Sequence, residues 1–347
     1  MVFFVIDFLK IQLGIKVPVA FSYTSTRMML AALTSLVLVI FLGPYFIRKL
    51  YELKIGQTIR SEHCPLLGEL HSKKKDTPTM GGALILFSML SSMLIWMDLT
   101  HIFTLILLAT TLSLGFLGAW DDYLKLKYKN TKGLSARRKL LFQALVGGLL
   151  ALYLLSPTIA NAVHFGDWFA PPVVKEHIAV KGAQESQLHT QHLVSQKEYA
   201  GRIYFPFFKD PVIVLSGAFT ALAALFIIFI VTGASNGVNL TDGLDGLAAG
   251  CLIMVATCLA VIAFLSNNVD IASYLNILYI GGSGEIAIYL SAFVGACIGF
   301  LWYNGHPAQV FMGDTGSLAL GGIIGVSAIL LKREILLGLI GGIFVME

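Results

Sequence analysis

The sequence is poor in charged residues, and above all in acidic ones. Only 20 of its 347 residues are Asp or Glu, and charged residues of both signs make up 13%. Hydrophobic residues make up 56%, and the mean hydropathy is +0.80. These values lie far outside the range of soluble domains. The composition therefore excludes a soluble globular protein and predicts an integral membrane protein.

Several other features are missing. The four cysteines show no paired spacing, so we interpret them as reduced packing residues with no disulfide or zinc role. The sequence contains no P-loop, no G-x-S-x-G and no H-E-x-x-H motif, which argues against the enzyme classes that those motifs mark. No cleavable signal peptide is evident, because residues 2–9 carry an Asp and no basic region precedes them.

Long apolar runs dominate what is present. About nine of them approach the roughly 20 residues that a transmembrane helix needs. They are rich in Leu, Ile, Phe, Gly and Ala without strict alternation, which favours helices over a β-barrel. We therefore predict an all-α polytopic membrane protein. The predicted spans are 28–47, 81–97, 102–119, 140–156, 211–233, 246–266, 285–303, 317–331 and a last one that begins near 335.

The basic residues predict an orientation for these spans. The loops 48–80 and 120–139 each hold seven of the 24 Lys and Arg residues, and the positive-inside rule places both in the cytoplasm. The N-terminus and the polar stretch 157–210 are then external. We expect 157–210 to be a surface loop that can include a short hairpin. Its histidines are irregularly spaced, so they are only a weak signal for a metal site.

The few carboxylates gather, together with one amide, at the ends of apolar runs. These residues are Asp121, Asp122, Asn239, Asp242, Asp245 and Asp314. The orientation set by Lys and Arg places all of them on the cytoplasmic side, so we predict a functional site on that face. Carboxylates at membrane depth are costly and usually functional. Adjacent aspartates suit Mg²⁺, although a solvated loop entrance paired with lysines is the alternative for this pair.

Asn239, Asp242 and Asp245 are spaced i, i+3, i+6, which would stack them on one face of a helical turn. Nearby glycines would allow a ligand to approach the backbone. A polar helix cap explains one such residue but not three. Asp314 taken alone fits a helix N-cap as well as a functional carboxylate, and His306 fits a structural role as well as phosphate binding or proton transfer.

The stretch 73–82 joins a basic run to the start of a helix. Thr and Pro before Gly-Gly predict a turn and a helix N-terminus that could bind an anion, with Lys74 or a neighbour on the phosphate. The alternative is a basic anchor for the adjacent span, and Lys139 at the start of the fourth span allows the same two interpretations. Carboxylates, lysines and amides at a membrane interface suggest metal-assisted phosphoryl or glycosyl-phosphoryl transfer.

Five segments resemble the signatures of the polyprenyl-phosphate N-acetylhexosamine-1-phosphate transferases, in the family's order across residues 70–330. They are K-D-T-P-T-M-G-G, D-D-Y-L-K, G-L-S-A-R-R-K, N-L-T-D-G-L-D-G and N-G-H-P-A-Q-V-F-M-G-D-T-G-S. The resemblance is strongest to the branch that uses UDP-N-acetylmuramoyl-pentapeptide and undecaprenyl phosphate. It implies a Mg²⁺-dependent enzyme of the bacterial inner membrane that forms lipid I and UMP in peptidoglycan synthesis.

The resemblance also implies a role for each matched residue. Asp314 would be the Mg²⁺ ligand, and Asp121 and Asp122 would support the metal and activate the polyprenyl phosphate. The implied catalytic residues are Asp121, Asp122, Asp314, His306 and Lys139. The implied nucleotide-sugar pocket contains Lys74, Thr79, Lys125, Asn239, Asp242, Gly243, Leu244, Asp245, Asn304 and Phe311.

Our first mechanistic hypothesis is direct attack by the lipid phosphate, with Asp121 orienting it or removing a residual proton. A covalent aspartyl intermediate is the second. We expect membrane lipid as a partner, a second copy of the chain as a further candidate, and no nucleic acid. The family implies ten spans, so we expect residues 1–347 to be a single transmembrane domain that is truncated within its last hydrophobic stretch.

One departure and three rival functions remain. Asp76 stands where the family usually has Gly before T-P-T. A polyprenyl-phosphate GlcNAc-1-phosphate transferase would share the acids and differ in sugar and peptide recognition. An ion-coupled transporter would usually show repeats and place its carboxylates near the midplane, whereas here they lie at one edge. An intramembrane aspartyl protease is matched only superficially by M-G-D-T-G.

Overall fold

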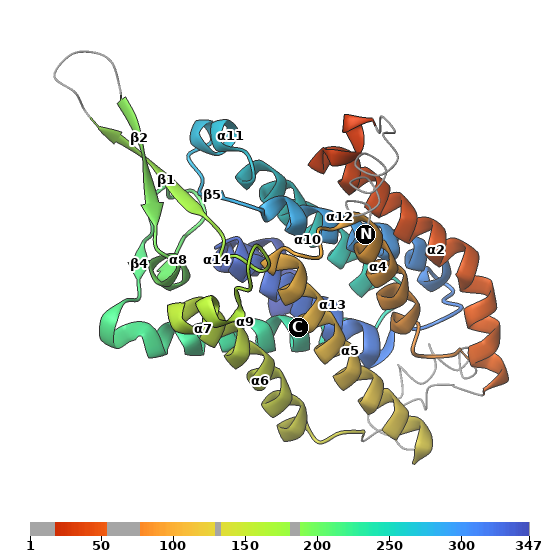
Figure 1. Ribbon diagram of the computed structural model, residues 1–347. Helices are drawn as coiled ribbons and strands as arrows, with labels where there is room; N and C mark the ends of the chain where they lie inside the picture. Colours follow the sequence, from red (N-terminus) through yellow and green to blue (C-terminus); the bar gives the residue numbers. More distant parts are fainter. Residues whose placement is uncertain (1–17, 54–76, 129–132, 181–187, 347) are drawn as a thin grey trace.

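The computed structural model describes residues 18–53, 77–128, 133–180 and 188–346. These residues form a bundle of helices from which one β-hairpin projects (Figure 1). The main helices are α2 (Thr24–Glu52), α4 (Gly82–Trp96), α5 (Ile102–Lys127), α6 (Ala136–Leu155), α9 (Thr220–Thr241), α10 (Leu247–Ser266), α12 (Ser283–Asn304) and α13 (Gly313–Leu330). Short helices are α7 (Pro157–Val163), α8 (Gln196–Gly201), α11 (Val269–Tyr274), α14 (Glu334–Ile340) and α15 (Gly342–Met346), with 3₁₀ turns at Val19–Ser22 and Gly217–Phe219.

Within the described residues, seven helices are long and apolar enough to cross a membrane. They are α2, α5, α6, α9, α10, α12 and α13, and they confirm the predicted all-α polytopic membrane class. The run predicted as a span at 81–97 forms the shorter α4, and the run near 335 forms α14 and α15, which Gly341 separates. The side of the membrane on which each end of the bundle lies stays a prediction.

Helix α13 is the centre of the bundle. A helix that is apolar on all sides is stable in the interior of a bundle, and every residue from Thr315 to Leu330 is buried. It packs against α5, α9 and α4, while α12 packs against α2 and α10 and α6 packs against α9. The first turn of α13, which carries Asp314, is therefore surrounded by the ends of other helices.

Helices α5 and α9 extend well beyond the C-terminal boundaries that hydropathy predicted. Helix α5 continues to Lys127, so Asp121 and Asp122 lie within a helix and not at a loop entrance. Helix α9 covers Thr220–Thr241 in place of the predicted 211–233. Hydropathy marks apolar side chains, whereas a helix continues for as long as its backbone hydrogen bonds persist and its polar side chains find partners in neighbouring helices.

The stretch 157–210 contains the short hairpin that the sequence allowed and, in addition, the helices α7 and α8. Strand β1 (Val174–Val180) pairs antiparallel with β2 (Leu188–Val194), and β5 (Tyr279–Ile280) joins the other edge of β1. Strands β3 (Arg202–Ile203) and β4 (Ile213–Val214) form a separate pair. Arg202 connects the hairpin to α8, because its guanidinium contacts Glu176 at 2.9 Å and Glu198 at 2.7 Å.

Candidate active site

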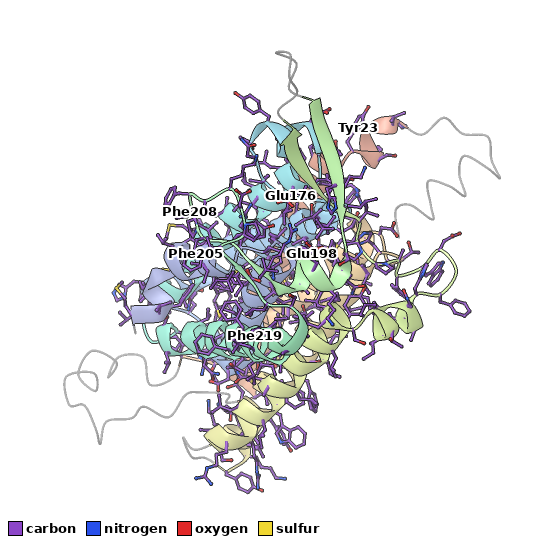
Figure 2. All side chains as sticks on the ribbon, turned by 90° about the vertical axis from the view of Figure 1, so that its left-hand side faces the viewer. Tyr23, Glu176, Glu198, Phe205, Phe208 and Phe219 are labelled. Atoms are coloured by element: carbon purple, nitrogen blue, oxygen red, sulfur yellow. The ribbon has the colours of Figure 1, made fainter. Side chains whose placement is uncertain are left out.

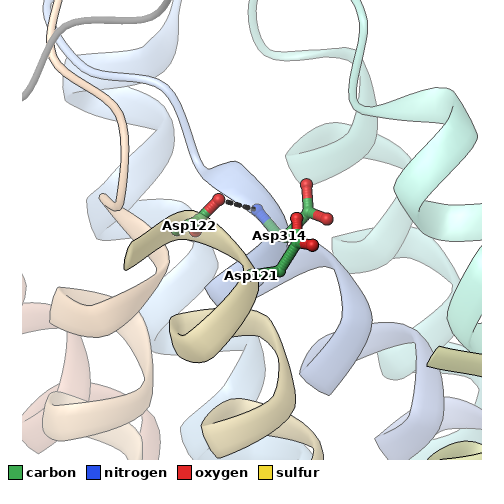
Figure 3. Close-up of side chains that lie close together, drawn as sticks. All are labelled: Asp121, Asp122 and Asp314. Atoms are coloured by element: carbon green, nitrogen blue, oxygen red, sulfur yellow. Dashed lines mark hydrogen bonds between the residues drawn. The ribbon is translucent and has the colours of Figure 1, made fainter. Parts of the chain in front are cut away.

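Three carboxylates meet at one end of the bundle. Asp121 and Asp122 lie on α5, and Asp314 lies on α13. Asp121 is 0% exposed and Asp122 3%. One oxygen from each of the three carboxylates lies within 4.8 Å of the others, and Figure 3 shows the three side chains gathered where the two helices meet. The structure thus brings together the two acidic groups that the sequence places 192 residues apart.

The close approach of α5 and α13 depends on Gly118, which lies one helical turn before Asp121 and Asp122. A Cβ atom at Gly118 would lie 2.1 Å from the backbone oxygen of Asp314, well inside van der Waals contact. Small residues allow membrane helices to pack at such short range. Any larger residue at position 118 would push the carboxylates of the two helices apart.

Two lysines lie among the carboxylates. Lys125, one turn beyond Asp121 on α5, places Nζ 2.7 Å from Asp121 Oδ2 and 2.9 Å from Asp314 Oδ1. Lys139 at the start of α6 places Nζ 3.0 Å from Asp121 Oδ2 and 2.6 Å from Asp314 Oδ2. Dissolved salt weakens partly buried ion pairs of this kind much less than exposed ones. Three anions and two cations therefore form one cluster, and Lys139 is part of it and not simply a membrane anchor.

Asp122 has a different set of partners from its neighbour. Its Oδ2 accepts hydrogen bonds from the backbone N–H and the hydroxyl of Thr315, at 2.9 and 2.7 Å, and its Oδ1 lies 3.3 Å from the backbone nitrogen of Asp314. These N–H groups belong to the first turn of α13, where a helix has no partners of its own for them. Asp122 thus caps α13 from another helix. Asp314 does not act as the N-cap of α13: Met312 occupies that position and makes no side-chain capping bond.

The segment before α4 pairs with the segment before α13. Phe311 donates its N–H to Pro78 O, and Gly81 and Gly82 donate theirs to Phe311 O and Met312 O, all at 2.8 Å. The predicted anion site at the start of α4 is therefore wrong for these two N–H groups, because backbone carbonyls already occupy them. Lys74 lies outside the described residues.

Thr79 lies beside the carboxylate cluster. Gly313 adopts φ +74°, and a Cβ atom there would lie 2.7 Å from Thr79 Oγ1 and 2.9 Å from Asp122 Oδ2. Only glycine takes this conformation and this space without strain. The buried hydroxyl of Thr79 is thus packed against the turn that leads into Asp314.

The predicted stacking of Asn239, Asp242 and Asp245 on one helical face is wrong, because α9 ends at Thr241. Asn239 is helical, and its Oδ1 accepts a 2.6 Å hydrogen bond from Ser317. Asp242 follows the helix, and its carboxyl group lies near the backbone N–H of Gly313. Burial, and after it the negative charge of Asp314, raises the pKa of Asp242 well above its usual range. Asn239 and Asp242 therefore face the α13 turn, while Asp245 lies in the loop beyond.

Asp245 belongs to a second polar group. Its Oδ2 lies 3.1 Å from His306 Nδ1 and accepts the N–H of Ala308 at 3.1 Å. The buried Asn304 accepts the N–H of Gly246 at 3.0 Å and donates to Val310 O at 2.9 Å. Gly243 and Leu244 are exposed in the same turn. These contacts fasten the loop after α9 to the loop after α12.

His306 is the predicted catalytic residue with the least support from the geometry. Its imidazole is 78% exposed, and its contact in the described structure is with Asp245, not with the carboxylates of α5 and α13. The backbone of Phe311 takes part in the pairing before α13, and its side chain is partly exposed. The roles of both residues stay predictions.

Sequence analysis missed a chain of polar side chains that leads away from the cluster. Gln143, 0% exposed on α6, donates to Ser235 Oγ at 2.9 Å and accepts from Asn236 at 2.7 Å. Ser235 in turn donates to Leu318 O at 2.8 Å. The signal was present in the sequence, since Gln143 is a polar residue inside an apolar run, one turn after Lys139. These bonds fix α6 and α9 against the first turns of α13.

The cluster has the donor chemistry of a site for a hard cation. Carboxylate oxygens are the ligands that such ions prefer, and the three carboxylates can direct one oxygen each toward a common point. Asp121 Oδ2 is buried and accepts no well-directed hydrogen bond, although both lysine ammonium groups lie within 3.0 Å of it. The residues present thus fit a metal ion.

A helical membrane bundle with a carboxylate–lysine cluster at one end defines a polytopic membrane enzyme built for phosphate chemistry. The family model described as "Glycosyl transferase family 4" matches residues 104–332, and "Phospho-N-acetylmuramoyl-pentapeptide-transferase signature 1" matches residues 74–86. This chain therefore belongs to glycosyl transferase family 4 and, within it, to the phospho-N-acetylmuramoyl-pentapeptide-transferases.

Curated relatives support the same assignment. The phospho-N-acetylmuramoyl-pentapeptide-transferase of Protochlamydia amoebophila is 64% identical over 350 residues, which cover 100% of this chain and 85% of that protein. The proteins of the same name from Desulfotalea psychrophila and Endomicrobium trichonymphae are each 42% identical over 327 residues, covering 94% of this chain and 78% of theirs. The resemblance seen in the signature segments is thereby confirmed.

Proposed function

We propose that this protein transfers phospho-N-acetylmuramoyl-pentapeptide from its UDP-linked precursor to undecaprenyl phosphate, giving lipid I and UMP in peptidoglycan synthesis. Its family supports the reaction class, because its relatives carry the name of this transferase. The observation that carries the proposal is the meeting of Asp121, Asp122 and Asp314 with Lys125 and Lys139 at one end of the bundle.

In the reaction, a phosphate oxygen of undecaprenyl phosphate attacks the phosphorus that bears the sugar. The new P–O bond forms as the bond to the bridging oxygen of the pyrophosphate breaks, and that oxygen leaves with UMP. A phosphate monoester is largely ionised at neutral pH, so little proton remains for a base to remove. Asp121, fully buried against Lys125 and Lys139, orients the attacking phosphate or accepts its residual proton.

The two lysines bind phosphate oxygens. In the protein alone, their ammonium groups are shared between Asp121 and Asp314. Phosphate oxygens of the two substrates can take over part of this coordination, because an ammonium group has three donors. Holding both reacting phosphates in line and offsetting the charge that develops between them are the main protein contributions to phosphoryl transfer.

We further propose that the metal is Mg²⁺, with Asp314 as its principal ligand and Asp121 and Asp122 in support. When bound, Mg²⁺ would neutralise charge on the pyrophosphate and on the departing UMP. The hydrogen bonds from Thr315 leave Asp122 less free than Asp314 to turn toward a ligand. Asp122 therefore acts mainly by holding the first turn of α13 in place.

The nucleotide-sugar pocket is proposed to extend from Thr79 and the α13 turn to the loop after α9. Asn239 and Asp242 face that turn, and Asp245, Asn304 and His306 fasten the neighbouring loops. Gly243 and Leu244 would lie nearest the uridine. Lys74 and Phe311 complete the proposed set.

The proposed reaction also implies where in the cell the site lies. One substrate is a soluble nucleotide sugar and the other a membrane lipid, so the site must lie at the cytoplasmic edge of a bacterial inner membrane. The basic residues of 48–80 and 120–139 support that orientation by the positive-inside rule. The chain is proposed to form one transmembrane domain.

The deciding experiment is Mg²⁺-dependent release of UMP from UDP-N-acetylmuramoyl-pentapeptide by the purified protein with undecaprenyl phosphate. Omitting the lipid, or adding a chelator, should stop the release. UDP-GlcNAc in place of the precursor tests the rival GlcNAc-1-phosphate transferase. Turnover of UDP-GlcNAc with none of the peptide precursor would overturn the assignment.

A further inference from the structure

A cavity of about 540 Å³ lies at the end of the bundle away from the carboxylates. Helix α13 connects the two places: it is about 27 Å long, Asp314 lies in its first turn, and Arg333, which lines the cavity, follows its last turn. Helix α10 runs the same way, from the loop of Asp245 to Leu265 in the cavity wall. The cavity is therefore distinct from the proposed transfer site and lies at the opposite membrane edge.

The walls of this cavity are mostly apolar. Ile262 and Leu265 come from the end of α10, Leu275 from the loop after α11 and Leu336 from α14. The aromatic segment 204–208 closes another side, and Figure 2 shows Phe205 and Phe208 on the same face of the molecule as Glu176 and Glu198. A volume of several hundred Å³ with apolar walls is typical of sites that take small organic groups or lipid chains.

One cation in the wall, Arg333, makes no close ion pair in the part of the chain that the structure describes; the carboxylate of Glu334 attracts it but is held by Lys332. The half-buried guanidinium of Arg333 lies over the ring of Tyr204, 5.8 Å from its centroid, and makes no ion pair or hydrogen bond there. Arginine stays charged, and the guanidinium nitrogens of Arg333 remain open to solvent. The guanidinium thus has donors to offer to a ligand.

The nearby carboxylates are already paired. Glu334 takes a 2.6 Å contact from the buried Lys332. Glu176, the acidic residue of the cavity wall, contacts Arg202 at 2.9 Å. Lys209 adds a second, exposed cation to the lining. The charges that face the cavity therefore favour an anion.

We propose that this cavity binds an anionic phospholipid of the adjacent membrane leaflet. Its phosphate would meet Arg333, with Lys209 at the rim, and its acyl chains would run along Ile262, Leu265 and Leu336. A guanidinium is well matched to phosphate oxygens, and basic pockets between membrane helices are suited to acidic lipid headgroups. The apolar walls favour a lipid over free inorganic phosphate, which would leave them bare.

The test uses the purified full chain in neutral detergent and measures binding of phosphatidylglycerol and phosphatidylcholine by native mass spectrometry. Arg333→Gln should weaken phosphatidylglycerol binding on the order of tenfold, the value of a charge-assisted hydrogen-bonded contact, and leave phosphatidylcholine unchanged. Arg48→Gln is the matched control, because Arg48 is an exposed arginine on α2. Equal losses in the two variants, or no loss in Arg333→Gln, would show that the cavity is not the lipid site.

A second variant distinguishes loss of the lipid site from loss of folding. Leu275→Trp fills the cavity from a wall residue that is 44% exposed, so Arg333 and the packing of the bundle stay intact. It should reduce phosphatidylglycerol binding to a similar degree. Normal binding by Leu275→Trp would overturn the proposal even where Arg333→Gln does not fold. Inorganic phosphate should not displace phosphatidylglycerol from the protein. If it does, the cavity is a simple anion site and the lipid proposal is wrong.

The outcome of the lipid-binding measurement does not depend on whether the proposed transferase reaction is correct. Arg333 and Leu275 lie at the far end of α13 and α10 from the carboxylates. Both variants should therefore keep the transfer rate of the unchanged protein in neutral lipid. A protein that failed the UMP assay would still give a clear answer on phosphatidylglycerol binding.

Discussion

Asp122 and Thr315 form a two-point contact across 193 residues of sequence. One carboxylate oxygen of Asp122 accepts both the backbone N–H and the hydroxyl of Thr315, at 2.9 and 2.7 Å. The contact joins α5 to the first turn of α13, next to Asp314. Helix α5 therefore supplies both a carboxylate for the cluster and the cap that holds the other carboxylate's helix in place.

Thr315→Val tests this cap without changing the charge of the site. The substitution keeps the shape of the side chain and removes one hydrogen bond to a buried carboxylate, so it should lower the free energy of unfolding by about 1.5–3 kcal/mol. Denaturation in detergent would measure it. Thr257→Val, the same change at an exposed position of α10, should be nearly neutral; equal effects of the two would show that the contact adds no stability.

Asp314→Asn should reduce Mg²⁺-dependent UMP release by at least about 100-fold, because it removes the charge of the proposed metal ligand. The protein should still fold, because the single amide oxygen can accept from one of the two lysines and both lysines keep Asp121 as a partner. Asp270→Asn, at an exposed site on α11, serves as the control. Near-normal turnover by Asp314→Asn would remove Asp314 from the role of metal ligand.

Lys139→Gln should lower kcat by roughly 10-fold to 100-fold, because one of the two cations that face the reacting phosphates is lost. Arg138→Gln is matched to it, since the neighbouring Arg138 is exposed on the same helix turn. Steady-state kinetics with both substrates would distinguish them. If both variants lose the same activity, general positive charge near the membrane, and not the cluster, explains the effect.

The choice between direct attack and a covalent intermediate can be settled by trapping. Incubation with labelled nucleotide precursor and no undecaprenyl phosphate should leave the protein unlabelled under direct attack. Label on Asp121, Asp122 or Asp314 would instead establish the aspartyl intermediate. Asp314→Asn protein is the control for non-covalent carry-over of the precursor.

Glu285→Gln tests a structural ion pair far from the site. Glu285 contacts Arg27 at 2.7 Å and accepts the N–H of Asp98 at 2.9 Å, and both charged side chains are nearly inaccessible. Leaving Arg27 buried beside a neutral amide should cost about 3–5 kcal/mol of unfolding free energy. Activity per folded molecule should not change. The exposed Glu52 on α2 gives the control substitution, Glu52→Gln, which should have little effect on unfolding.

Composition, hydropathy and local motifs were sufficient to predict the class of the protein. An apolar helix must lie in lipid or in a bundle because of its own side chains, so the membrane class follows from local sequence. The signature segments likewise identified Asp121, Asp122, Asp314, Lys125 and Lys139 before any geometry was known. The hairpin within 157–210 was expected for similar local reasons.

The tertiary structure alone decided how those residues act. Lys125 meets Asp314 across 189 residues, and nothing in local periodicity specifies which helix ends will meet. The same reason explains why two of the local predictions differ from the structure. The N–H groups before α4 are taken by the segment before α13, and α9 ends before Asp242 and Asp245 can share a face with Asn239. Sequence supplied the candidate side chains; packing around α13 decided which of them pair and which cap a helix.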